Sequence, residues 1–86
     1  MRPWYRLPRD ERAALAAGYI GKTVTVVIDP LRRRSDLRAV YHGRLVAVAG
    51  PAASGTTSEI VVFTTDTGGV KWAALSVVEG IQEDVK

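Results

Sequence analysis

The spacing of apolar residues changes at Thr23, and this change limits what the 86-residue chain can fold into. Residues 8–18 are rich in alanine and lie between Pro8 and Gly18, which predicts one short helix with Leu15 and the alanines on its apolar face. From Thr23 onward, apolar and polar side chains alternate in short runs separated by turn-forming residues, which predicts β-strands. A chain of this length has room for one domain.

Five strands are predicted, at residues 23–28, 37–49, 59–65, 70–75 and 77–81. The second is long, and Gly43 at its middle predicts a bulge or sharp bend that lets one strand pair on two sides of the fold. The run Asp66–Gly69 is typical of a hairpin turn, because glycine adopts positive φ angles without strain. We therefore predict an all-β fold with a short N-terminal helix, closed into a five-stranded small β-barrel that exposes no sheet edge.

The predicted organisation is a single β-barrel domain over residues 1–86. An extended arm is expected at 1–7, the helix at 8–18, the barrel at 23–81 and a polar tail at 82–86. The small and polar residues of segment 50–58 predict a loop.

Composition excludes several classes of site. The chain has no cysteine and one histidine, so we expect no disulfide framework, no metal site and no cofactor. No apolar run reaches the roughly 18 residues that a membrane helix needs, and residues 1–10 contain no apolar core of signal-peptide length. We therefore expect a cytoplasmic protein that contacts no membrane.

Positive charge is concentrated in the first half of the chain. Residues 1–44 carry ten basic and four acidic side chains (+6), whereas residues 45–86 carry two basic and five acidic ones (−3). A dense basic run, with two more arginines on the polar face of the second strand, consists of Arg32, Arg33, Arg34, Arg38 and Arg44. Clustered guanidinium groups bind nucleic-acid phosphates, so these five are the candidate contacts to RNA. The alternative is a solvated loop whose charge keeps the protein soluble.

Three motifs suggest catalysis or nucleotide binding, and each has a simpler structural interpretation. The run Gly21–Thr23 resembles the end of a phosphate-binding loop, but Ala16 stands where that motif needs glycine, and a strand follows instead of a helix. The triplet Asp66–Gly68 matches the aspartic-protease motif, which works only as a pair of carboxylates, so a hairpin turn is preferred. His42 has no recognisable serine and aspartate partners and is expected at a surface or interface. We expect no enzymatic activity, no catalytic residues and no small-molecule substrate.

The two tryptophans are assigned different roles. Trp72 alternates with Lys71, so Trp72 is expected in the core if Lys71 faces water; the alternative is a stacking or interface residue. Trp4 and Tyr5 lie on the arm and are expected either to pack across the barrel or to contact a neighbouring subunit.

The pattern as a whole resembles the Sm-like superfamily of small β-barrels, which includes the LSm and Hfq proteins, and more broadly the SH3-like barrels. The resemblance covers residues 9–82. Besides the helix, it lies in Gly21–Val26, Tyr41–Val48, Ile60–Phe63 and Val70–Val78. Tyr41-His42-Gly43-Arg44-Leu45 is similar to the family's hydrophobic-x-G-x-L stretch in its bent second strand. Ala74-Leu75-Ser76-Val77-Val78 is similar to the second motif of the Hfq type.

This resemblance implies a ring-forming homo-oligomer in which the fourth strand of one subunit pairs with the fifth strand of the next. It also implies binding of single-stranded RNA through the loops after strands two and four. Together with the arm, it indicates an interface that includes Trp4, Tyr5, Trp72, Leu75 and Val77. The family's RNA-binding positions differ here: its Lys-His pair falls on Trp72-Ala73, and its Arg-Gly pair falls on Glu79-Gly80.

The sequence thus favours a non-enzymatic Sm-like barrel that forms homo-oligomers and binds single-stranded RNA through its basic loop. The alternative function is a protein–protein interaction or structural assembly module without nucleic acid. In that alternative, the basic half of one subunit contacts the acidic half of another.

Overall fold

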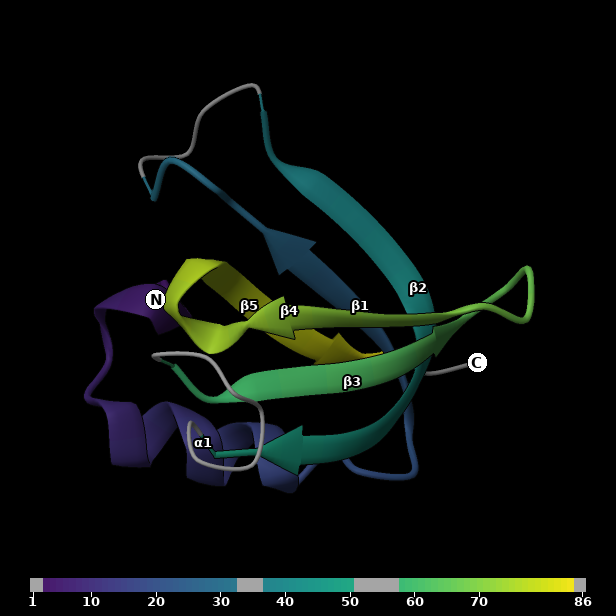
Figure 1. Cartoon of the computed structure of the whole chain (residues 1–86), viewed down its shortest axis with the longest axis horizontal. Helices are drawn as coiled ribbons and strands as arrows, with labels where there is room; N and C mark the ends of the chain where they lie inside the picture. The colour runs from purple at the N-terminus through teal and green to yellow at the C-terminus, as the bar shows by residue number, and fades with distance from the viewer. Residues whose placement is uncertain (1–2, 33–36, 51–57, 85–86) are drawn as a thin grey trace.

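Figure 1 shows the fold in a computed structural model that describes residues 3–32, 37–50 and 58–84. In chain order the elements are the 3-10 helix η1 (Trp4–Arg6), helix α1 (Arg9–Ala17), strands β1 (Thr23–Ile28), β2 (Ala39–Ala49), β3 (Ile60–Thr65) and β4 (Val70–Ala74), the 3-10 helix η2 (Leu75–Val77) and strand β5 (Val78–Glu83). The predicted N-terminal helix and five strands are confirmed. Most of the loop expected at 50–58 lies outside the described residues.

Both predicted ends of the chain differ from the structure. The arm expected to be extended contains η1, because the N–H of Arg6 donates to the carbonyl of Pro3 (3.0 Å) and that of Leu7 to the carbonyl of Trp4 (2.9 Å). This turn buries Trp4. Strand β5 continues to Glu83, where a tail was expected, because Val24 on β1 still pairs with Glu83.

The strands form one antiparallel sheet in the order β4-β3-β2-β1-β5. Strand β2 pairs with β1 through Ala39–Arg44 and with β3 through Gly43–Ala49, so one strand serves both halves of the sheet. A register shift between Leu45 and Ala47 marks a bulge, and β2 follows a wide arc in Figure 1. The predicted bend is confirmed, with its bulge beyond Gly43.

Gly43 serves a close approach between two backbones. A Cβ atom added there would lie 1.6 Å from the carbonyl oxygen of Thr64 on β3. That distance is far inside van der Waals contact, so the residue at position 43 must lack a side chain while β2 and β3 keep their spacing.

The sheet is open, and the predicted closure into a barrel is not observed. Among the described residues, no hydrogen-bonded ladder joins β4 to β5, which are the two edge strands. Helix η2 carries the chain between these edges: the N–H of Leu75 donates to the carbonyl of Glu59 beside β3 (2.9 Å), and the N–H of Asp29 after β1 donates to the carbonyl of Val77 (2.8 Å). Helix η2 is thus hydrogen-bonded at its first and last residues and joins β4 to β5 only where the chain passes from one strand to the other. Along the rest of its length, β4 pairs with β3 alone.

The core lies on one face of the curved sheet, which we call the inner face. Val24, Val26, Leu45 and Phe63 are buried there, as the alternation in the first two strands predicted. The opposite, outer face carries the other half of each strand.

Helix α1 lies next to the C-terminal end of β2 in Figure 1. It adds Ala16 to the core, whereas Leu15, predicted on the apolar face of the helix together with the alanines, is 43% exposed. Arg12, one turn before Ala16 and therefore on the same side of the helix, forms an ion pair there.

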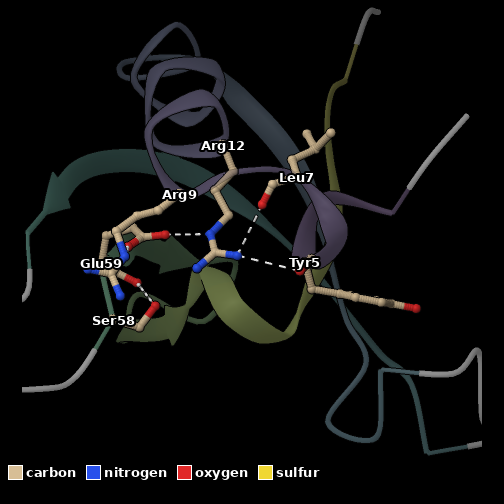
Figure 2. A network of polar contacts seen from close by, with 6 residues as sticks. All are labelled: Tyr5, Leu7, Arg9, Arg12, Ser58 and Glu59. Atoms are coloured by element: carbon tan, nitrogen blue, oxygen red, sulfur yellow. Dashed lines mark hydrogen bonds and ion pairs between the residues drawn. The ribbon is translucent and has the colours of Figure 1, made fainter.

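This ion pair attaches α1 to the sheet (Figure 2). Glu59, which precedes β3, is 2% exposed, and its carboxylate lies 2.5 Å from Nε of Arg12 and 3.4 Å from Nε of Arg9. Nη1 of Arg12 also donates to the carbonyls of Tyr5 and Leu7, both at 3.5 Å. One guanidinium therefore fixes η1, α1 and the start of β3 relative to one another.

Candidate functional site

Strand β4 forms one open edge of the sheet and exposes two large apolar side chains. Val70 is 70% exposed and Trp72 is 60% exposed. They lie opposite Thr64 and Val62 of β3, respectively, and therefore both point to the outer face. Soluble proteins usually protect such an edge with charge, proline or a covering element, and the single charged residue of β4 is Lys71.

The prediction that Trp72 is a core residue is wrong. Lys71 lies opposite Phe63, so it is Lys71 that starts on the inner face, while Trp72 faces outward. Tyr41, opposite the buried Val26, is on the same face, and Nζ of Lys71 lies 5.1 Å from the centroid of its ring. A hollow of about 250 Å³ beside β4 is lined by Ile28, Tyr41 and Phe63 together with the β4 residues Val70, Lys71 and Trp72.

The other open edge, β5, borders a larger apolar groove of about 650 Å³, which we call the β5 groove. Its apolar lining comes from four parts of the chain and includes Trp4, Leu7, Leu15, Tyr19, Val27 and Ile81. Glu11 and Glu79 are the charged residues of the lining, and Gly80 forms part of its floor. The indole of Trp4 stands beside Gly80, 3.9 Å from where a Cβ would be. A groove with apolar walls and two acidic residues thus runs along an edge strand, whose one ladder in the described chain is with β1.

Of the predicted RNA-contacting arginines that the structure describes, Arg38 and Arg44 lie apart from each other. Arg38 is 3.3 Å from the carboxylate of Glu79, so part of its charge is neutralised within the chain. Arg44 lies six residues further along, about 20 Å away at the strand rise of about 3.3 Å per residue. Arg33 and Arg34 lie outside the described residues. Arg32 is exposed, and its backbone is in the left-handed region (φ 54°), which residues other than glycine rarely adopt.

Arg32 instead lies near the N-terminal segment. Together with Tyr5 and Arg6 it lines a hollow of about 220 Å³. Two arginines and a tyrosine from separate parts of the chain therefore line the same space. The basic sequence run did not indicate Arg6 as a member of this group.

The five predicted interface residues lie in different environments. Trp4 is 7% exposed and its ring centroid is 6.2 Å from that of Tyr19, so it packs within its own chain, one of the two alternatives predicted for the arm. Leu75 is fully buried in η2, and the neighbouring Val77 and the arm residue Tyr5 are half-buried. Only Trp72 offers a large exposed apolar surface.

His42 has partners that the sequence did not reveal. It lies opposite Thr25 on the outer face, and its Nδ1 is 2.9 Å from Oγ1 of Thr25. The Thr25 hydroxyl donates to Oδ1 of Asp84 at 2.5 Å, so Nδ1 of His42 is the donor to Thr25. A ring nitrogen that donates to the hydroxyl does not act as its base. The cluster therefore lacks the arrangement of a Ser-His-Asp triad.

The two remaining motifs have the simple structures expected of them. Gly21, with φ of 87°, leads directly into β1. Asp66 is exposed in the β3–β4 hairpin, where Gly68 has φ of 85° and the N–H of Thr65 donates to the carbonyl of Gly69 at 2.9 Å.

Within residues 3–32, 37–50 and 58–84, no three histidine or carboxylate side chains gather as metal ligands would. Nor does this described part contain a helix of the length and apolarity needed to cross a membrane. The outstanding features are thus two open edges, one with an exposed tryptophan and one with an apolar groove. Comparison with models of known protein families, with curated proteins and with solved structures gives no match.

Proposed function

We propose that this protein is a non-enzymatic assembly module whose copies associate head to tail, β4 of one copy pairing with β5 of the next. The observation that carries this proposal is the open sheet: in the described residues, β4 pairs with β3 alone and β5 with β1 alone, so each has one side without a neighbouring strand. An unpaired edge is a template for another strand, and pairing extends the sheet from copy to copy.

The residues of the two edges support this pairing. Strand β4 contributes Val70, Trp72 and the positive charge of Lys71, and β5 contributes the negative charges of Glu79 and Glu83. Both carboxylates also pair within their own chain, Glu79 with Arg38 and Glu83 with Lys22, each at 3.3 Å. Strand β5 carries no basic residue, so β4–β5 contact avoids the like charges that two copies of Lys71 would bring together in a β4–β4 contact. A 9.3 kDa chain also has a small core, so burial between copies adds stability that a single copy lacks.

The resemblance to Sm-like proteins supports the same arrangement, because rings of that family form by pairing of the fourth strand with the fifth strand of the next subunit. We propose that the open sheet of this chain is such a small barrel, completed on assembly. A head-to-tail contact uses two different surfaces, so it produces a closed ring where the rotation between copies closes.

Replacing Val70 with lysine should reduce the wild-type oligomer to the 9.3 kDa monomer. The substitution places a second positive charge beside Lys71 on the exposed edge, a device by which natural edge strands avoid pairing. Sedimentation equilibrium over a wide concentration range measures the mass.

Val40→Lys is the matched control, because Val40 is also exposed on the outer face but lies on β2, an interior strand. This variant should keep the wild-type mass. A wild-type protein that stays monomeric at every concentration would remove the proposed function.

A second candidate function, binding of single-stranded RNA, is favoured by the hollow that Tyr5, Arg6 and Arg32 share. Two guanidinium groups suit phosphate contacts, and a tyrosine ring suits stacking on a base. Arg32 also has a left-handed backbone, a strained conformation that is found more often at binding sites than elsewhere.

If RNA binds here, Arg6→Ala and Arg32→Ala should each weaken binding of a single-stranded oligonucleotide to a similar degree for all base sequences. Each should also lower the slope of log affinity against log salt by about one, because each removes one phosphate contact. Fluorescence anisotropy titrations at several salt concentrations measure both quantities. Arg44→Ala, far along β2, is the control, and equal losses in all three variants would argue against a site at this hollow.

A further inference from the structure

We infer that Trp72 of one copy inserts into the β5 groove of the next and supplies most of the specificity of the head-to-tail contact. This inference rests on the proposed function and deepens it, because it names the side chain and the receiving surface that distinguish β4–β5 contact from any other pairing of edges. The occupant of the groove is thus a second copy of this chain.

The two surfaces lie on the same face of the sheet. Trp72 is opposite Val62, on the outer face of β4. Gly80 is opposite Val27 on the face away from the buried Val26, so the floor of the β5 groove also belongs to the outer face. When β4 and β5 of different copies pair, the outer faces become continuous, and Trp72 lies on the side of the sheet where the groove is.

The groove has space and chemistry for an indole. Gly80 has no side chain, so an aromatic residue on a neighbouring strand can cover its backbone, an arrangement known to stabilise edge glycines. The walls add the indole of Trp4 and the side chains of Leu15 and Tyr19. At about 650 Å³, the groove can accept the indole together with part of the β4 strand.

Charge favours a copy of this chain as the occupant. The charged residues of the groove lining, Glu11 and Glu79, are both acidic, and because Glu79 pairs with Arg38 of its own chain, Glu11 contributes most of the negative charge. Lys71, next to Trp72, is the charged residue of β4 and is basic. An apolar groove with acidic charge favours a strand that has an exposed tryptophan beside a lysine. Strand β4, at the other edge of the same sheet, has both residues.

The experiment uses one variant on each side of the contact. Trp72→Ala removes the inserted side chain but leaves the groove intact. Gly80→Val fills the floor of the groove but leaves Trp72 intact; its Cβ would meet only ordinary contacts, at 3.9 Å from the Trp4 ring. Each variant alone should sediment as a monomer, with association weakened about 30-fold or more, as expected for loss of a central tryptophan contact.

Mixing the two variants provides the decisive measurement. The Gly80→Val copy offers Trp72, and the Trp72→Ala copy offers an intact groove, so one contact can form and no second can follow. The equimolar mixture should therefore reach twice the 9.3 kDa mass of one copy and stop there. Leu15→Glu, at an exposed position of the groove wall, replaces Gly80→Val if the latter does not fold.

The outcomes separate this inference from the proposed function. If Trp72→Ala and the groove variants keep the wild-type mass while Val70→Lys lowers it, the edges pair without the insertion, and the inference is overturned. A mixture that remains monomeric overturns it as well. A wild-type protein that is monomeric at every concentration removes both proposals together.

Discussion

Replacing Arg12 with methionine should lower the free energy of unfolding by about 3 kcal/mol, measured by urea denaturation followed by circular dichroism. The change keeps the apolar stem of the side chain but leaves the carboxylate of Glu59, 2% exposed, without its 2.5 Å partner. Breaking a buried ion pair from one side costs about 3–5 kcal/mol. The lower end applies because Arg9 remains 3.4 Å from the same carboxylate.

Two control variants test this explanation. Arg9→Met should cost less than about 1 kcal/mol, because the Arg9 side chain is 59% exposed and screened by solvent. The double variant Arg12→Met, Glu59→Met should recover most of the lost stability, because no buried charge is left unpaired. A double variant as unstable as Arg12→Met would show that the loss comes from the broken contacts to the carbonyls of Tyr5 and Leu7.

Gly43→Ala should destabilise the fold by at least about 3 kcal/mol, at the upper end of the cost of overpacking. The new Cβ would lie 1.6 Å from the carbonyl oxygen of Thr64, so β2 and β3 must separate along the ladder that holds the two halves of the sheet together. The thermal unfolding midpoint should fall sharply, or the variant should not accumulate in folded form.

Gly50→Ala is the matched control, because an added Cβ meets nothing within 4 Å at that position. It should change stability by less than about 0.5 kcal/mol, as surface substitutions usually do. A Gly43→Ala variant as stable as Gly50→Ala would mean that β2 and β3 approach each other less closely than the structure shows.

Alternation along the sequence predicted the strands that have neighbours on both sides. In β1 and β2 the apolar residues face a filled core, so Val24, Val26 and Leu45 show a clear period of two. The same rule gave the wrong face for Trp72. Because β4 is an edge strand, a charged residue on its inner face is not fully enclosed. Lys71 can therefore occupy that face, with its ammonium group 5.1 Å from the centroid of the Tyr41 ring.

The local spacing of apolar residues could predict neither whether the sheet closes into a barrel nor where the candidate site lies. Whether β4 meets β5 depends on how η2 is anchored at Glu59 and Asp29, and no spacing in the sequence encodes those two hydrogen bonds. The β5 groove unites residues of η1, α1, β1 and β5. The Arg12–Glu59 pair joins positions 47 residues apart. What the sequence did contain was the resemblance to a family that assembles through its fourth and fifth strands, and a tryptophan in the fourth.

The order of the strands also has a consequence for how the chain reaches this structure. Strands β1 to β4 form successive hairpins, each pairing with the next along the chain, and these ladders can form early because their loops are short to moderate in length. The β1–β5 ladder joins Val24 to Glu83, across most of the sequence. A growing chain therefore has β1 as its temporary edge during synthesis. The β5 edge, on which the proposed assembly depends, exists only after residues 78–83 have emerged and docked.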